Sequence, residues 1–342
     1  MQRCVTGAGC FLVLLFAVGC SVNNGAPPAK AQAATSPATS SSSAAPSSSA
    51  TITASSPIDP GSLDDAPPPP EKTAGFDGQK AFDHVKKLVE IGPRPPDSPG
   101  IHKAQEYMQA QLRSFGCTVE EDNFGASTPI GQVQMKNLLV KIQGNSPNVI
   151  LLTTHYDTLT MDNFVGADDG GSSTGLMLEM ARHFCSHKNA LTIWIAFFDG
   201  EEAFRQWNND TDSTFGSREM AAKLNASGDL RRIKAMMLAD IIGYKNLRIK
   251  RETNSTPWLT DLVWATAARL GYGKVFVSEQ TAIEDDHLAF LKRKVPCVDV
   301  IDLEIPYWHT TQDTLDKISP RSLAIVGHVF VESIGELQKK FR

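Results

Sequence analysis

The chain has 342 residues, of which 41% are hydrophobic and 21% charged, an ordinary composition for one large or two medium-sized globular domains. Its 38 Asp and Glu residues outnumber 33 Lys and Arg residues, a net charge of -5, so no basic excess indicates nucleic acid or an anionic membrane surface as a partner. Nearly all the charge follows residue 64. Setting aside about 75 N-terminal residues leaves about 267, the size of one α/β domain and not of two catalytic domains.

The first 20 residues have the pattern of an export signal. Arg3 precedes an apolar run, residues 11–18, which is too short to span a bilayer. The Ala-Val-Gly-Cys string that ends at Cys20 resembles the site at which bacterial lipoproteins are cleaved and acylated, with ordinary signal cleavage nearby as the alternative. We therefore expect an exported bacterial lipoprotein that faces the periplasm or the cell surface and touches a membrane only through its lipid anchor.

Residues 21–75 are rich in Ser, Ala, Pro and Thr. Such a segment has too little apolar surface to offset the entropy of ordering, so we predict a disordered linker that leads to a catalytic domain over residues 76–342.

Three of the six cysteines lie beyond the leader, at Cys117, Cys185 and Cys297. An odd and widely spaced set is no disulfide framework, and at most one pair could bridge. Because each lies in or near an apolar or helical stretch, we expect all three to be packing residues.

Apolar runs alternate with amphipathic patterns along the rest of the chain. Apolar residues at helical spacing predict helices at 77–91, 102–114, 172–184, 258–270 and 320–339. Short apolar runs predict strands at 137–141, 149–154, 191–198, 235–239 and 295–301. Several of these runs are continuously apolar, as strands covered on both faces are. The pattern predicts an α/β fold, a three-layer α/β/α sandwich with a mixed, mostly parallel central sheet.

Polar residues collect directly after the predicted strands, at the edge where open α/β sheets form their sites. His155 and Asp157 end one strand and point to the same side of it, so the carboxylate can orient the imidazole or help it to hold a metal. Asp168 and Asp169 lie on a glycine-rich loop before a helix, which they could instead simply cap.

Asp199, Glu201 and Glu202 follow the most hydrophobic strand. Three carboxylates in four residues repel one another unless a cation or proton intervenes, and a solvated acidic turn is the alternative. Asp240 ends another strand, and His309 lies in a loop after the last one. Carboxylate and imidazole ligands without thiolates suit a catalytic Zn²⁺ with an open position. In the Glu-Glu pair, one side chain can bind metal while the other acts as a base toward substrate.

From about residue 76 onward, the chain resembles the zinc-dependent M28 peptidase superfamily and, within it, the glutaminyl-peptide cyclotransferases, or glutaminyl cyclases. The superfamily resemblance rests on HYD at 155–157, GADD at 166–169, EE at 201–202, Asp240 and His309. The closer resemblance rests on the strings IGPRPPDSPG, FFDGEEAFRQW, FGSRE, EDDHLAFLKRKVP and WHTTQDTLDKI. It implies an M28 hydrolase-like fold and conversion of the N-terminal glutamine of peptides or proteins to pyroglutamate, with release of ammonia.

The resemblance also implies roles for individual residues. The residues that it assigns to one zinc ion are Asp169, Glu202 and His309. Glu201 would be the general acid/base, with Asp240 and Asp285 in the hydrogen-bond network that supports it.

The substrate pocket shows departures from the family. Trp207 and Trp308 would wall it, but the loop before Trp308 is about one residue shorter, which places Ile305 where an aromatic pocket residue is expected. Thr154 and Thr174 stand where animal secretory cyclases carry a disulfide. The resemblance therefore leaves the metal centre intact and alters the pocket.

Two other functions remain open, a zinc aminopeptidase of the M28 type and a non-catalytic binding module. In the two-zinc aminopeptidases, residues matching His155 and Asp240 also bind metal and Asp169 bridges, so one zinc ion is expected and two are possible. The cyclase-like strings favour one. We expect a monomer that takes peptides or proteins with N-terminal Gln as substrates and binds no nucleic acid.

Overall fold

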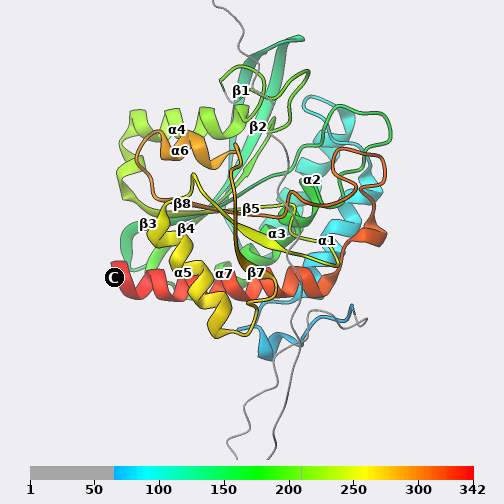
Figure 1. Cartoon of the computed structure of the whole chain (residues 1–342). Helices are drawn as coiled ribbons and strands as arrows, with labels where there is room; N and C mark the ends of the chain where they lie inside the picture. Colours follow the sequence, from blue (N-terminus) through cyan, green and yellow to red (C-terminus); the bar gives the residue numbers. More distant parts are fainter. Residues whose placement is uncertain (1–64, 209) are drawn as a thin grey trace, which may run out of the picture. The chain divides into compact units, whose positions relative to one another are not determined.

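The computed structural model describes residues 65–208 and 210–342 (Figure 1). The predicted export signal, its lipidation site at Cys20 and the linker up to residue 64 lie outside the described residues. No helix in the described part of the chain is long and apolar enough to cross a membrane.

Ordered structure begins within the segment expected to be a linker. Pro70–Lys72 form a short 3-10 helix. Thr73 is buried, and its hydroxyl donates a hydrogen bond to the carbonyl of Phe76, also buried, at 2.6 Å. The folded domain therefore starts before residue 76.

A six-stranded mixed sheet forms the middle layer, with strand order β1-β2-β4-β3-β5-β8. The strands of this sheet are β1 (Val119–Thr128), β2 (Gly131–Ile142), β3 (Ser146–His155), β4 (Leu191–Phe198), β5 (Ile233–Asp240) and β8 (Cys297–Ile301). The pairs β1–β2 and β2–β4 are antiparallel, whereas β4–β3, β3–β5 and β5–β8 are parallel. The predicted mixed, mostly parallel sheet is confirmed.

Helices cover both faces of this sheet (Figure 1). They are α1 (Gly78–Ile91), α2 (Pro99–Ser114), α3 (Gly171–Cys185), α4 (Phe215–Ser227), α5 (Pro257–Arg269), α6 (His287–Leu291) and α7 (Pro320–Phe341). In β3, Ile150 and Leu152 join the apolar cluster with α1, α2, α3, α5 and α7, while Val149 and Leu151 join the cluster with α4 and α6. Since successive strand residues point to opposite faces, the continuously apolar strands form a buried central layer, and the three-layer sandwich is confirmed.

All five predicted helices and all five predicted strands are present, and their bounds agree within three residues except that β2 begins six residues earlier than predicted. Apolar periodicity did not predict α4, α6, the polar strand β1 and a two-stranded parallel sheet of β6 (Ile249–Glu252) and β7 (Phe276–Thr281). These elements are short or carry many polar residues, so tertiary packing and not apolar periodicity defines them.

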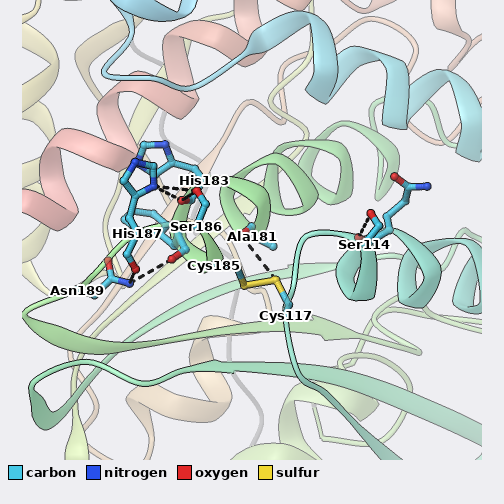
Figure 2. The surroundings of a disulfide bond; sticks show 10 residues. Ser114, Cys117, Ala181, His183, Cys185, Ser186, His187 and Asn189 are labelled. Atoms are coloured by element: carbon cyan, nitrogen blue, oxygen red, sulfur yellow. Dashed lines mark hydrogen bonds between the residues drawn. A yellow bond between two sulfur atoms is a disulfide. The ribbon is translucent and has the colours of Figure 1, made fainter.

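Cys117 and Cys185 form a disulfide, with Cα atoms 5.6 Å apart (Figure 2). The prediction that both are unpaired packing residues is wrong. Cys117 lies between α2 and β1, and Cys185 is the last residue of α3, which contacts α2. The packing of these helices brings together two residues that are 68 positions apart in the sequence. Cys297 is buried and free, as a packing residue should be.

Thr154 and Thr174, which the resemblance places where animal secretory cyclases carry a disulfide, connect the end of β3 to the start of α3 by hydrogen bonds. Thr174, in the first turn of α3, donates to the carbonyl of His155 at 2.9 Å, and Thr154 donates to the hydroxyl of Ser173 at 2.7 Å. Helix α3 is therefore fixed to β3 at its start and cross-linked through Cys185 at its end.

We expect the double variant Cys117→Ser/Cys185→Ser to lose about 4 kcal/mol of unfolding free energy, because the disulfide closes a loop of 68 residues and restricts the unfolded chain. Guanidinium unfolding of oxidised wild type and variant measures this loss. Reductant should lower the wild-type midpoint and leave that of the variant unchanged. Equal midpoints for oxidised wild type and variant would contradict the stabilising role.

Candidate active site

The carboxyl ends of the four parallel strands meet at one edge of the central sheet. Strand β4 lies on one side of β3 and β5 on the other, so the connections out of β3 and β4 run in opposite directions, an arrangement that opens a crevice at this edge. His155 ends β3 and Asp240 ends β5, while Glu201 and Glu202 follow β4. The fold thus brings acids and histidines that are far apart in the sequence to one edge of the sheet.

The backbone around Asp169 is held in place by a second carboxylate. Asp313 accepts hydrogen bonds from the N–H of Asp168 at 2.8 Å and from that of Asp169 at 3.0 Å. Gly170 follows with φ +72°, and a Cβ at this position would lie only 2.6 Å from the carbonyl oxygen of Asp157. Glycine is therefore required for the loop to pass β3 closely before α3 begins.

The turn that carries Glu201 and Glu202 is fixed in the same way. Asp157 accepts hydrogen bonds from the N–H of Glu201 at 3.1 Å and from that of Glu202 at 3.2 Å. Its carboxylate also lies 3.5 Å from Nδ1 of His155. Asp157 therefore positions the Glu-Glu turn in addition to facing the imidazole, as the strand pattern predicts.

Asp169, Glu202 and His309 place one donor atom each within 4.8 Å of one another. Nε2 of His309 lies 3.4 Å from Oδ2 of Asp169 and 3.4 Å from Oε2 of Glu202. Both carboxylate oxygens of Glu202 are buried and have no hydrogen-bond partner among the described residues, a costly state without a cation. His309 also adopts φ +52°, a strained backbone of the kind found at ligand sites. These three residues fit a divalent metal ion.

The pKa shifts at the site reflect the crowding of charged groups. Burial raises the pKa of Glu202 to about 7, and repulsion from Asp169 adds to the rise. Burial acts to lower the pKa of His309, but the nearby carboxylates of Asp169 and Glu202 outweigh this and raise it to about 10. Burial raises the pKa of Glu201 well above its usual range, with His155 opposing the rise and Glu202 adding to it. A cation at this position would favour the ionised carboxylates.

A second group of donors shares Asp169. Nε2 of His155 lies 3.0 Å from Oδ1 of Asp240 and 3.3 Å from Oδ1 of Asp169. The same Asp240 oxygen accepts a hydrogen bond from the N–H of Ile241 at 2.9 Å. Nε2 of His155 and Oδ1 of Asp240 are therefore already hydrogen-bonded, unlike the Glu202 carboxylate, whereas Nδ1 of His155 has no hydrogen-bond partner among the described residues.

Behind these residues lies a third buried group of Asp285, His287 and Asp299. Nε2 of His287 is 3.3 Å from Glu252, and its Nδ1 is 3.7 Å from Asp299, so the imidazole bridges two carboxylates. Burial raises the pKa of Asp285 well above its usual range, and repulsion from Asp240 adds to it. Asp285 therefore connects this buried group to the site.

A cavity of about 350 Å³ opens onto the acids, with Asp169, Glu201, Glu202, Asp240, Asp285 and His309 in its wall. Trp207 and Trp308 line it as well. Trp308 stacks on His309 with ring centroids 4.1 Å apart and is 43% exposed. Ile305 is buried in an apolar cluster with Ile241, a residue of the cavity wall, and does not itself line the cavity. The sequence placed Ile305 at the surface of the pocket, whereas the structure places it behind that wall.

Arg94 is a site residue to which the sequence motifs assign no role. Its side chain is completely buried and donates hydrogen bonds to carbonyls on both sides of the site loop, including those of Tyr156 at 3.2 Å, Val165 at 2.7 Å and Gly166 at 3.1 Å. Burial lowers the pKa of Arg94 to about 10, which leaves it charged at neutral pH. The only sign of this role in the sequence is an arginine among prolines, in the string GPRPPDSPG after a predicted helix. The string does not reveal which carbonyls the guanidinium would contact.

Comparisons with known proteins agree with this geometry. Residues 137–334 match peptidase family M28. The glutaminyl cyclase of an Acidobacteriales bacterium is 41% identical, with a TM-score of 0.73 over 78% of this chain and 96% of that one. The chain belongs to peptidase family M28 and, within it, to the glutaminyl cyclase family.

Two further relatives support this assignment. The glutaminyl cyclase of Porphyromonas gingivalis is 31% identical, with a TM-score of 0.72 over 77% of this chain and 99% of that one. A glutaminyl-peptide cyclotransferase of Bothrops jararaca is 30% identical over 282 residues, which cover 70% of this chain and 76% of the relative.

We expect Glu202→Ala to lower the amount of divalent metal bound per chain, because it removes one of three donors, and Glu201→Gln to leave it unchanged. Metal content after dialysis, measured by plasma mass spectrometry, tests both variants. Glu219→Ala, on the exposed face of α4, controls for loss of a negative charge elsewhere. Equal metal loss in the Glu201 and Glu202 variants would contradict this assignment.

Proposed function

We propose that the chain is a glutaminyl-peptide cyclotransferase that converts N-terminal glutamine of peptides or proteins to pyroglutamate and releases ammonia. In this proposal Asp169, Glu202 and His309 hold one zinc ion. When bound, the zinc would act as a Lewis acid on the γ-carboxamide oxygen of the substrate.

The cavity carries this proposal. Its volume of about 350 Å³ is near the lower limit for small-molecule sites, so it suits one terminal residue better than a long stretch of peptide. Trp207, Trp308 and Glu201 all line the cavity. Indole surfaces around a compact substrate exclude water, which favours attack by the substrate's own α-amine over hydrolysis.

Glu201 is the group placed to move the proton. Burial raises the pKa of Glu201 well above its usual range, which is the direction that suits a carboxyl group acting as both base and acid. In the forward reaction, Glu201 accepts a proton from the α-amine as the amine nitrogen bonds to the γ-carboxamide carbon. It then returns that proton to the amide nitrogen, which leaves as ammonia when the carbon–nitrogen bond breaks. Asp240 and Asp285 line the same cavity and supply the carboxyl groups that surround Glu201.

The donor contacts support one zinc ion. The Glu202 oxygens have no hydrogen-bond partner among the described residues, whereas one oxygen of Asp240 already accepts two contacts, from Ile241 and His155. A second ion at His155 and Asp240 would displace those contacts.

An M28 aminopeptidase with one or two zinc ions is the alternative, since it would use the same acids, with Glu201 activating water. Incubation with a Gln dipeptide amide and with a chromogenic Leu amide separates the two activities. We expect ammonia and a pyroglutamyl product from the first substrate and no hydrolysis of the second. Hydrolysis of the Leu amide alone would refute the cyclotransferase.

We expect Glu201→Gln to lower kcat for the Gln dipeptide amide by about 10²- to 10⁴-fold, the usual contribution of a general acid/base. The assay is ammonia release at saturating substrate, with metal content confirmed as above. Turnover within a few-fold of wild type would exclude Glu201 from the proton transfer.

We also propose that the chain is exported and anchored through a lipid on Cys20. The signal-like leader supports this, and so does the Cys117–Cys185 disulfide, because disulfides persist in oxidising compartments. In a bacterial host, labelled palmitate should be incorporated into wild type and not into Cys20→Ser, and the wild type should fractionate with membranes. Unlabelled wild-type protein in the soluble fraction would contradict the anchor.

A further inference from the structure

A second and larger cavity, of about 610 Å³, adjoins the segment that carries the Glu-Glu pair. One wall is formed by residues 124–127 of β1. The facing walls come from α4, the turn before it, and α6 with the residues after it, through Arg218, Lys292 and Arg293 among others. We call this cavity the β1 groove.

The β1 groove runs along an edge of the central sheet. Four consecutive residues of β1 line it, including Gly125, which has no side chain, so main-chain atoms of β1 form part of its wall. Among the strands that the structure describes, β1 pairs only with β2 and ends the sheet, so half of its main-chain N–H and C=O groups face away from β2.

The charged residues of β1 lie only in its first half. Glu120, Glu121 and Asp122 are of the kind that blocks pairing with another strand, whereas residues 123–128 carry no charge. The uncharged half is the half that lines the groove. An extended peptide can add to such an edge through main-chain hydrogen bonds.

The facing wall of the groove carries two guanidinium groups that are held by carbonyls. The guanidinium of Arg218 donates to the carbonyls of Ser213 and Asp210 and lies over the ring of Phe215, while that of Arg293 donates to a carbonyl of α6. Within residues 65–208 and 210–342, neither guanidinium forms an ion pair with a carboxylate. Lys292, by contrast, pairs with the Asp210 carboxylate at 3.0 Å. The groove also contains the carboxylates of Asp210 and Glu219, which pair with Lys292 and with Lys223. The two guanidinium groups are therefore the charges of this lining that favour an acidic ligand.

The β1 groove lies close to the active-site cavity. The carbonyl of Glu201, in the wall of one cavity, accepts a hydrogen bond at 2.8 Å from the N–H of Thr214, in the wall of the other. Asp285 lines the active-site cavity and Leu288 lines the groove, and three residues of chain span at most about 10 Å. At this point the linings of the two cavities are separated by no more than the span of three extended residues, so we place the substrate's fourth and later residues at the groove.

We propose that the β1 groove binds an acidic, extended segment of the polypeptide substrate, downstream of its N-terminal residue. The segment pairs with the free edge of β1 and places its carboxylates beside Arg218 and Arg293. This proposal rests on the cyclotransferase function proposed above, because the N-terminal glutamine is what brings the segment to the groove.

Matched substrates test the proposal. Each begins Gln-Gly-Gly-Gly and continues with either Glu-Val-Glu-Val or Lys-Val-Lys-Val. We expect kcat/KM for the acidic peptide to exceed that for the basic one by about tenfold at low salt, mainly through KM, and the ratio to shrink at high salt. In Arg218→Gln/Arg293→Gln the ratio should fall to about one, because the charges that select the acidic segment are gone. A wild-type ratio near one, or an unchanged ratio in the variant, would overturn the groove.

Lys86→Gln/Lys87→Gln is the matched control, since it removes two positive charges from α1, which packs against α3 and α7 on the other face of the sheet. It should retain the wild-type ratio. A fall equal to that in the arginine variant would assign the preference to overall charge and refute the groove.

A direct binding measurement separates failure of the groove from failure of the enzyme. Fluorescence anisotropy with an N-acetylated, labelled form of the acidic peptide needs no turnover. We expect binding that weakens at least about tenfold when alternate residues are N-methylated, because N-methylation removes the donors that pair with β1. Acid-selective binding without turnover of any Gln peptide would refute the cyclotransferase alone. Turnover without acid-selective binding, or binding insensitive to N-methylation, would refute the groove as proposed.

Discussion

Repulsion between buried carboxylates at the carboxyl edge of the central sheet is the constraint on which the site depends. Asp169, Glu201, Glu202, Asp240 and Asp285 all line one cavity of about 350 Å³, and burial disfavours the ionised form of each. Only a cation, the imidazoles and shared protons can offset this repulsion. A fold that holds these acids together therefore suits a cation at this edge and raises the pKa of Glu201, Glu202, Asp240 and Asp285.

Other buried polar side chains hold the backbone of the site and do not line the active-site cavity. Asp157 and Asp313 each accept hydrogen bonds from two successive N–H groups, and Arg94 gathers carbonyls from the loop between β3 and α3. The two carboxyl groups bind main-chain N–H groups and the guanidinium binds main-chain carbonyls, so these three residues fix the loops through both kinds of main-chain group. The donor atoms are thus prearranged by main-chain contacts.

The segment between β4 and α4 connects the active-site cavity to the β1 groove. It carries Glu201 and Glu202 on one side, and its end at Thr214 and Phe215 forms part of the β1 groove. The small indole-lined cavity can select the terminal residue of a substrate, and the open groove along the edge strand can select the residues downstream of it. Because the N–H of Thr214 donates to the carbonyl of Glu201, one short segment positions both the proton-transfer group and the surface proposed for the rest of the substrate.

The sequence by itself determined the layered fold and the membership of the site. Continuous apolar strands can be buried only between two layers of helices, and the carboxyl ends of parallel strands must share an edge, so His155, the Glu-Glu pair and Asp240 could be placed together in advance. Only the tertiary structure decided the Cys117–Cys185 bond, the contacts of Arg94 and the position of Ile305 behind the pocket wall. Those features depend on how helices pack and where loops turn, and such long-range contacts leave no periodic signal in the chain.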